Sequence, residues 1–313
     1  MGKVAVVAVG GNSLIKDKAH QTVEDQYAAV LETSQHIVKM IKTGYEVVIT
    51  HGNGPQVGFI LRRSEIARSQ VHEVPLDSCG ADTQGAIGYN FQMALGNEFL
   101  KHDMHKNVAT VVTQVLVDED DLAFKEPTKP IGSFLSYEEA MMLKQNEGWD
   151  MVEDAGRGWR RVVASPIPKQ IIELAAIKAL IANEIIVVAV GGGGIPVIRQ
   201  DDGSLKGVDA VIDKDFATSL LARNLNADVL IISTAVEKVA LNFGTPDEKA
   251  IDRMTVAEAK QYIEEGHFAP GSMLPKIKAI IEFIEGGGEK AIVTCPEKLE
   301  DAIMGRTGTL IVP

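Results

Sequence analysis

Short runs of β-branched and other apolar residues alternate along the chain with longer segments in which apolar residues recur every three or four positions. The short runs predict strands, and the longer segments predict amphipathic helices. The main predicted strands are residues 4–9, 45–50, 108–117, 185–190, 229–234, 291–294 and 309–312. The main predicted helices are residues 22–43, 77–101, 170–182, 215–225 and 275–285. This alternation favours an α/β fold, a three-layer α/β/α sandwich around a large, mainly parallel open sheet.

Local signals mark where several helices begin. Thr22 is the expected N-cap of the first long helix, because its hydroxyl can accept a hydrogen bond from a free backbone N–H. Ser136-x-x-Glu139 and Thr255-x-x-Glu258 have the spacing of capping boxes, in which both side chains bond to the other residue's backbone. These signals predict helices that start directly after residues 136 and 255.

The pattern changes between residues 118 and 168. This segment contains an acidic run, several prolines and both tryptophans of the chain. It also holds the helix capped by Ser136 and a predicted hairpin with strands at residues 149–154 and 159–164. We therefore predict a small inserted α+β lobe at residues 118–168, and a single larger α/β domain formed by residues 1–117 and 169–313.

Composition narrows the classes of function. The chain has 313 residues, with 31 Lys and Arg against 43 Asp and Glu, which gives a formal net charge of -12. This charge opposes binding to nucleic acid or to an anionic membrane, so neither is an expected partner. The two cysteines, Cys79 and Cys295, are too few and too far apart for a disulfide framework, and the longest apolar run is too short to span a bilayer. We expect a cytoplasmic protein.

Glycine clusters follow three of the predicted strands. The sequence Val-Val-Ala-Val-Gly-Gly occurs twice, ending at Gly11 and at Gly192, and a third cluster follows His51. In an open α/β sheet, ligands bind outside the carboxyl ends of the strands, where glycine lets backbone N–H groups approach an anion. A single cluster is equally well explained by a tight turn. Three clusters at one sheet edge favour two anionic groups that meet between two halves of the domain.

Several known motifs are absent from the sequence. There is no Gly-x-x-x-x-Gly-Lys-Ser/Thr loop, and the glycines after His51 do not have the spacing of a dinucleotide fingerprint, because Val57 stands where a glycine is needed. Nor is there a Gly-x-Ser-x-Gly elbow or a His-Glu-x-x-His pair. These absences disfavour a P-loop enzyme, a standard dehydrogenase, a serine hydrolase and a zinc protease.

Lysines in unusual settings are the next signal, because an acidic protein that binds phosphates must supply local positive charge. Lys129 lies in a proline-rich loop, Lys214 stands between Asp213 and Asp215, and Lys276 begins a helix, where a cation is locally unfavourable. We interpret all three as functional. Asp213 and Asp215 could each organise these lysines or reach a metal on nucleotide phosphates, or they could be helix caps, an interpretation that suits Asp215 better. His51 could be a general base or a buried packing residue.

Taken in order, these segments resemble the carbamate kinases of the amino-acid kinase family, from end to end of the chain. The motifs that carry the resemblance are Val9-Gly10-Gly11-Asn12, His51-Gly52-Asn53-Gly54-Pro55-Gln56-Val57-Gly58, Pro127-Thr128-Lys129-Pro130-Ile131-Gly132, Glu153 to Arg160, Gly191 to Pro196, Val211-Ile212-Asp213-Lys214-Asp215 and Gly266 to Lys276. Other branches of the family carry a lysine on the first strand, where this chain has Ala8 and Val9. Carbamate kinases also lack that lysine, and Lys129 in the lobe takes its place.

The resemblance implies reversible phosphoryl transfer between ATP and carbamate, which gives ADP and carbamoyl phosphate, in a homodimer and with Mg²⁺ carried by the nucleotide phosphates rather than by protein side chains. It implies that the lobe covers the active site, that the N-terminal half binds the acceptor and that the C-terminal half binds the nucleotide. The implied catalytic residues are Lys129, Lys214, Lys276 and Asp213. The implied substrate-binding residues are Gly10, Gly11, Asn12, Gly52, Asn53 and Gly54. The implied nucleotide-binding residues are Gly191, Gly192, Gly193, Ala235, Val236 and Met273.

Carbamate already carries a negative oxygen, so the reaction needs no base to activate it, and we expect no essential general base. Two other interpretations remain open. The acceptor could be another small carboxylate or a phosphonate, or the protein could be a non-catalytic nucleotide or metabolite sensor. The sequence does not distinguish the direction of the reaction in the cell.

Overall fold

The computed structural model describes residues 2–17, 19–153 and 158–313, and of Asn12 and Ser133 it describes the backbone alone. The strands of the main sheet are β1 (Lys3–Val9), β2 (Tyr45–His51), β3 (Val108–Thr110), β9 (Ile186–Val188), β12 (Val229–Ser233), β15 (Arg253–Thr255), β16 (Ala291–Thr294) and β17 (Thr309–Val312). Within the described ranges these eight strands run in the order β15-β17-β16-β12-β1-β2-β9-β3. All neighbours are parallel except β16 and β17, which are antiparallel.

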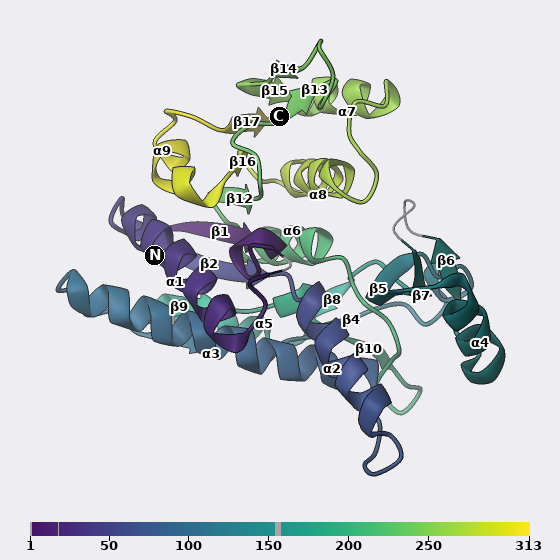
Figure 1. The fold of residues 1–313 in the computed structure, drawn as a ribbon. Helices are drawn as coiled ribbons and strands as arrows, with labels where there is room; N and C mark the ends of the chain where they lie inside the picture. Colours follow the sequence, from purple (N-terminus) through teal and green to yellow (C-terminus); the bar gives the residue numbers. More distant parts are fainter. Residues whose placement is uncertain (1, 18, 154–157) are drawn as a thin grey trace.

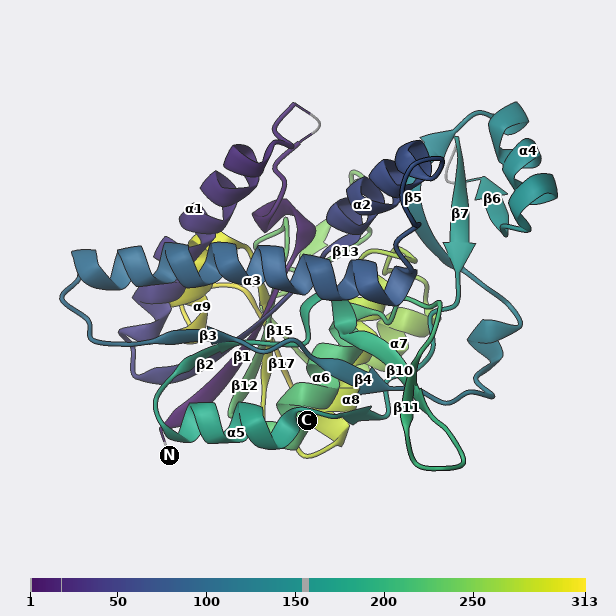
Figure 2. The same cartoon turned by 90° about the horizontal axis from the view of Figure 1, so that it is seen from below.

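Helices cover both faces of this sheet. The helices are α1 (Val23–Ile41), α2 (Gly54–Ala67), α3 (Leu76–Lys101), α5 (Leu174–Ala182), α6 (Lys214–Leu225), α7 (Val256–Glu264), α8 (Met273–Glu285) and α9 (Leu299–Ile303). One apolar core joins the sheet to α1, α3 and α9, and a second joins the opposite face to α5, α6 and α8. Figure 2 shows α3 crossing one face of the strands while α5 lies on the other. The predicted three-layer α/β/α fold is confirmed.

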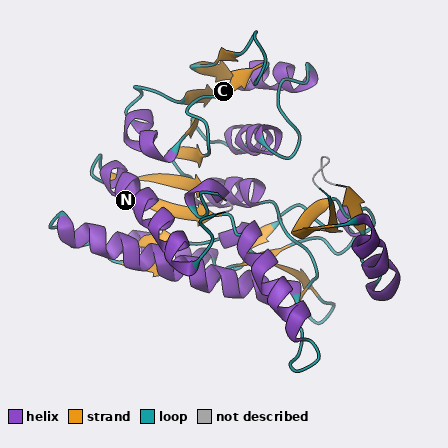
Figure 3. Cartoon of the chain, in the orientation of Figure 1, coloured by secondary structure: helices purple, strands orange, loops and turns teal. Residues whose placement is uncertain are grey.

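Strands of the main sheet are apolar because both of their faces are buried. In β1, every residue from Val4 to Val9 is buried, and the same holds for all of β9 and β12. Figure 3 shows these strands enclosed between helices. The predicted caps are present as well, since Thr22, Ser136 and Thr255 each complete a capping box.

Described residues between 129 and 163 form a small sheet and a helix at one end of the molecule (Figure 1). The elements are β5 (Lys129–Leu135), α4 (Tyr137–Glu147), β6 (Met151–Glu153) and β7 (Trp159–Val163), and the sheet has the order β5-β7-β6. The antiparallel pairing of β6 with β7 confirms the predicted hairpin, whose turn at residues 154–157 lies outside the described residues. The division of the chain into this lobe and one larger domain stays a prediction.

Two predicted elements differ from the structure. Residues 108–117, expected to be one strand, form β3 in the main sheet and β4 (Gln114–Leu116) in a second sheet. That sheet also contains β8 (Gln170–Ile171), β10 (Ile195–Arg199) and β11 (Leu205–Gly207), in the order β11-β10-β4-β8. The helix expected to start at Gln170 starts at Leu174, because Gln170 and Ile171 pair with β4 instead. The chain also contains a short hairpin of β13 (Ala240–Leu241) and β14 (Lys249–Ala250).

Candidate active site

In the register of the main sheet, the carboxyl ends of β1, β2 and β12 lie side by side. Val9, the last residue of β1, pairs with His51 at the end of β2 and with Ser233 at the end of β12. The chain leaves β1 and β2 into the glycine-containing segments that follow Val9 and His51. Both segments therefore start from the same edge of the sheet, as the sequence predicted.

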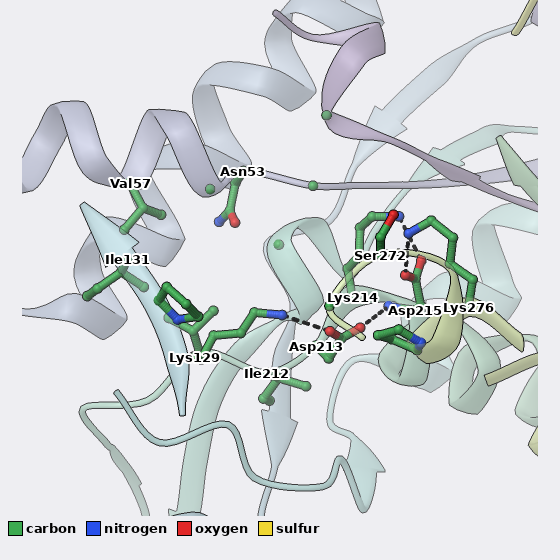
Figure 4. A pocket seen from close by; sticks show the side chains of 18 residues that line it. Asn53, Val57, Lys129, Ile131, Ile212, Asp213, Lys214, Asp215, Ser272 and Lys276 are labelled. Carbon is green, nitrogen blue, oxygen red and sulfur yellow. Dashed lines mark hydrogen bonds and ion pairs between the residues drawn. The ribbon is translucent and has the colours of Figure 1, made fainter. Parts of the chain in front are cut away.

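A cleft of about 250 Å³ opens at this edge. It is lined by Gly11, Gly52, Asn53, Gly54, Val57, Lys129, Pro130, Ile131, Gly192, Val211, Ile212, Asp213, Lys214, Asp215, Gly271, Ser272, Pro275 and Lys276. Residues from the N-terminal half, the lobe and the C-terminal half thus meet around one space, and Figure 4 shows the three lysines approaching it from different elements. The cleft is suited to a small, strongly anionic ligand.

Two carboxylates hold the three lysines. Lys129 Nζ lies 2.7 Å from Asp213 Oδ2. Asp215 receives both other amines, since its Oδ1 lies 2.8 Å from Lys214 Nζ and its Oδ2 lies 2.9 Å from Lys276 Nζ. The side chain of Asp215 is only 4% exposed, and those of Lys214 and Lys276 are 15% exposed. Three ammonium groups against two carboxylates leave a net positive charge in the cleft.

Asp215 stays ionised in this setting. Its burial by itself would raise the pKa of the carboxyl, but the charges of Lys214 and Lys276 and their hydrogen bonds outweigh that effect and lower the pKa to about 2. Removing either lysine would therefore leave a buried carboxylate with one partner. Because both amines pair with the same carboxylate, Asp215 holds Lys214 Nζ and Lys276 Nζ close to each other.

The start of α6 explains why these residues converge, and it corrects one interpretation. Asp213 is the N-cap of α6, because its Oδ1 accepts a hydrogen bond from the backbone N–H of Asp215 at 2.9 Å. The sequence analysis assigned the cap to Asp215 and the orientation of the lysines to Asp213. In the structure Asp213 caps the helix and also pairs with Lys129, while Asp215 in the first turn orients Lys214 and Lys276. From the sequence, this role of Asp215 was the less favoured alternative to a helix cap, although two nearby cations that need a counter-charge were a usable signal.

Gly192 brings the two glycine segments into contact. A Cβ atom on this residue would lie 2.1 Å from Asn53 Nδ2, and its φ of +67° also favours glycine. Asn53 is in turn held by α3, since its Nδ2 donates to Thr83 Oγ1 at 2.8 Å. The next residue of α3, Gln84, donates to the carbonyl of Gly191 at 3.0 Å. Two successive residues of one helix thus hold the segment after His51 and the segment after Val190 in place.

His51 is a packing residue in this structure. It is 1% exposed, and its ring stacks on Phe91 with centroids 6.2 Å apart. Its Nδ1 lies 2.8 Å from the carbonyl oxygen of Gly52, so Nδ1–H donates to that oxygen. Burial lowers the pKa of His51 to about 4, which keeps the ring neutral at pH 7. His51 does not line the cleft among the described residues.

The low pKa of His51 predicts a loss of stability in mild acid. The unfolded chain takes up a proton near pH 6.5 while the folded chain does not until about pH 4, so stability falls as pH decreases through this window. The free energy of unfolding should fall by about 2 kcal/mol from this group between pH 7 and pH 5. Urea unfolding of His51→Asn should show a correspondingly smaller loss, whereas the exposed control His102→Asn should match the wild type. Equal losses of unfolding free energy between pH 7 and pH 5 in the wild type and both variants would contradict this role of His51.

Several predicted residues do not line the cleft in the described part of the chain. They are Gly10, Gly191, Gly193, Ala235, Val236 and Met273. Gly10 donates its N–H to the carbonyl of Ser233 at 3.0 Å, and Met273 packs against the apolar core beside α8. The side chain of Asn12 lies outside the described residues. The roles implied for these residues stay predictions.

The apolar side chains that form one wall of the cleft were not predicted from the sequence. Val57 from α2 and Ile131 from β5 lie together on the side of the cleft that carries Lys129 (Figure 4). Both are buried in a small cluster that also contains Leu76, Cys79 and Val163. Their only signal in the sequence was a hydrophobic residue next to a glycine or a proline, which is not specific.

Other kinds of site receive no support from the described residues. In that part of the chain, no group of three or more His, Cys, Asp or Glu side chains is placed to hold a metal ion. The two cysteines are free, and burial raises the pKa of both thiols to about 11. Across the described ranges, no helix is long and apolar enough to cross a bilayer.

Comparison with known proteins places this architecture in a family. A model of the amino acid kinase family matches residues 3–295. The carbamate kinase-like protein YahI of Escherichia coli (strain K12) is 53% identical over 100% of this chain and 99% of its own length, and the carbamate kinase of Pyrococcus furiosus is 48% identical over 100% of both. A structure of carbamate kinase from Giardia lamblia bound to AMP-PNP superposes with a TM-score of 0.93, at 44% identity over 99% of this chain and 98% of that one. The chain therefore belongs to the amino acid kinase family, in its carbamate kinase branch.

Proposed function

We propose that this protein is a carbamate kinase, which transfers the γ-phosphoryl group of ATP to carbamate and catalyses the reverse reaction. The observation that carries the proposal is the meeting of Lys129, from the lobe, with Lys214 and Lys276 around one small cleft. Several relatives of similar length are named carbamate kinases, and one of the similar structures holds an ATP analogue. Both facts support a phosphotransferase that uses a small anionic acceptor.

The reaction requires charge stabilisation more than proton transfer. An anionic oxygen of carbamate attacks the γ-phosphorus, a new P–O bond forms, and the bond from the γ-phosphorus to the bridging oxygen of ADP breaks. No proton has to leave the nucleophile, which agrees with a cleft whose described lining contains no histidine, and with a buried, neutral His51 at the end of β2. The charge that spreads over the transferring group is stabilised by Lys129, Lys214 and Lys276, held in advance by Asp213 and Asp215.

The three glycine segments divide the substrates between them. We assign the carbamate and the transferring phosphoryl group to the segment after β1 and the segment after β2, namely Gly10, Gly11, Asn12, Gly52, Asn53 and Gly54. We assign the nucleotide to Gly191, Gly192, Gly193, Ala235, Val236 and Met273. The contact of Gly192 with Asn53 supports a junction of the two sites at this point, because both residues line the cleft.

Magnesium is proposed to arrive with the nucleotide. Asp213 is occupied by Lys129 and by the N–H of Asp215, and Asp215 is occupied by two lysines, so neither carboxylate has an oxygen without a partner. This arrangement does not fit a metal held by protein side chains and fits one bound to nucleotide phosphates. When bound there, the ion supplies further positive charge at the phosphate oxygens.

The protein is also proposed to be a homodimer. Tyr89 is 60% exposed and Leu100 is 77% exposed, and their spacing of eleven residues puts both on one face of α3. Val112, two residues after the end of the edge strand β3, is 50% exposed as well. A second copy that covers this apolar surface would also protect the open edge of the sheet. Sedimentation equilibrium tests the proposed homodimer: the wild type should be a dimer and Leu100→Glu should shift toward the monomer. A monomeric wild type would contradict the proposal.

The choice of acceptor is tested by a panel of acyl phosphates. Purified protein, ADP and Mg²⁺ should form ATP from carbamoyl phosphate at a rate far above those from acetyl phosphate, other small acyl phosphates or phosphonate analogues. A higher rate from another donor would identify a kinase of a different small acceptor. Nucleotide binding with no ATP from any donor would favour the non-catalytic sensor.

A further inference from the structure

Helix α2 and strand β5 touch at two glycines, Gly58 and Gly132. A Cβ atom on Gly58 would lie 3.4 Å from the Cα atom of Gly132 and 3.8 Å from its carbonyl carbon. Glycine inside a helix is destabilising relative to alanine, so its presence at position 58 calls for a physical reason. The close approach of the β5 backbone provides one.

The strand is shaped to make this contact. Gly132 has a φ of +71°, a conformation that residues with a Cβ rarely adopt. The pairing of β5 with β7 also shifts register between Ile131 and Leu135, which indicates a β-bulge at this point. At this irregularity the backbone of Gly132, which has no Cβ, faces Gly58 of α2. Both partners of the contact are therefore adapted to it.

Packing holds the contact from two sides. On one side, Val57 and Ile131, the neighbours of the two glycines, are buried in the cluster with Val163. On the other side lies a cavity of about 30 Å³ lined by both glycines and by Trp149. A side chain larger than that of alanine at position 58 would have to fit into this small cavity or press against β5.

Lys129 lies three residues before Gly132 on the same strand. Its amine reaches 2.7 Å from Asp213, a residue on a different element 84 positions away in sequence. The position of this lysine therefore depends on how β5 is seated on α2, and a misplacement of about 1 Å can cost roughly 100-fold in rate.

We propose that the contact between Gly58 and Gly132 is a seat that fixes Lys129 over the cleft, which makes Gly58 a positioning residue for phosphoryl transfer. The proposal rests on the proposed function for its kinetic consequences. Its structural consequence, the placement of the lobe against α2, is independent of any activity.

Substitution of Gly58 gives a graded test. Gly58→Ala puts a Cβ at the limit of ordinary contact with Gly132 and should lower kcat only a few-fold, whereas Gly58→Val adds two further carbons and should lower kcat by roughly 10-fold to 100-fold. The KM for ADP should change little in both. Arg63→Val, at an exposed position of the same helix, controls for the effect of valine on α2 and should match the wild type.

A double-mutant cycle separates positioning from general damage. If Gly58→Val acts through Lys129, it should lower turnover little or not at all in a Lys129→Ala background. An equal fractional loss in both backgrounds would overturn the proposal, because the substitution would then act on some other part of the protein.

Fluorescence provides a readout that needs no activity. Both tryptophans of the chain, Trp149 and Trp159, are in the lobe, and Trp149 lines the cavity beside the two glycines. Gly58→Val should change the emission maximum or the acrylamide quenching of the folded protein, and Arg63→Val should not. Unchanged emission in Gly58→Val would overturn the proposed seat, whether or not the wild type transfers a phosphoryl group. If the wild type is inactive but the emission of Gly58→Val differs from it, the seat stands and the proposed function fails.

Discussion

Replacing Lys214 by alanine is expected to lower kcat for phosphoryl transfer by roughly 100-fold or more, because it removes one preorganised positive charge from the transferring group. The side chain is only 15% exposed and lies between Asp215 and the backbone of Gly52, so water cannot fully replace it. Steady-state ATP formation from carbamoyl phosphate measures the effect. The KM for ADP should change much less than kcat, as expected for an interaction used mainly in the transition state.

The matched control for this variant is Lys278→Ala. Lys278 is an exposed lysine of α8, two residues after Lys276, and its removal changes the net charge of the protein by the same amount. It should leave kcat within about two-fold of the wild type, as for most exposed positions away from a site. Near-normal turnover in Lys214→Ala would remove this residue from the mechanism.

Asp215→Asn is expected to lower both turnover and stability. The asparagine keeps the shape of the side chain but no longer neutralises Lys214 and Lys276, so two mostly buried cations lose their shared partner. Breaking a buried ion pair in this way costs roughly 3–5 kcal/mol of folding free energy. The loss of orientation of both amines should also lower kcat by roughly 100-fold. Urea unfolding and steady-state kinetics on the same preparation measure the two effects.

Asp252→Asn is the control for this second variant. Asp252 also pairs with a lysine, Lys238, but its side chain is 83% exposed, and exposed pairs contribute about 0–1 kcal/mol. Because the pKa of Asp215 is lowered to about 2, the stabilisation from its charge should persist at pH 5 and decline only as the pH falls below about 4. Wild-type stability in Asp215→Asn would contradict the assigned role of this carboxylate.

The layers and most elements could be predicted because their signals are local or periodic. The capping boxes at Ser136 and Thr255 depend on two residues three positions apart, and each opens a helix in the structure. The buried strands β1 and β12 are continuous apolar runs, as expected for a sheet covered on both faces. Such features need no knowledge of distant parts of the chain.

Elements with competing signals were missed. The sequence analysis predicted no helix at Gly54–Ala67, where Gly54, Pro55 and Gly58 indicate a loop. The structure shows that the proline stands in the first turn of α2, where its missing N–H costs nothing, and that Gly58 serves a tertiary contact. The break between β3 and β4 was not predictable either, because it depends on which sheet each half joins.

The site could be predicted in part. The rule that ligands bind at strand ends brought together Gly11, Gly52 and Gly192, and all three line the cleft. The exchange of roles between Asp213 and Asp215 was missed, because a difference of two residues in the helix start changes which carboxylate is the cap. The pairing of Lys129 with Asp213 spans 84 residues and depends on how the lobe packs on α2, which no local pattern encodes.

The most direct measurement of the central claim is the initial rate of ATP formation from ADP, Mg²⁺ and carbamoyl phosphate by the wild type, Lys129→Ala and Lys125→Ala. Lys125 is an exposed lysine of the same lobe and provides a matched loss of charge. We predict rapid ATP formation by the wild type and by Lys125→Ala, and a rate lower by roughly 100-fold in Lys129→Ala. No ATP from the wild type, or equal rates in all three proteins, would contradict a carbamate kinase whose inserted lobe completes the active site.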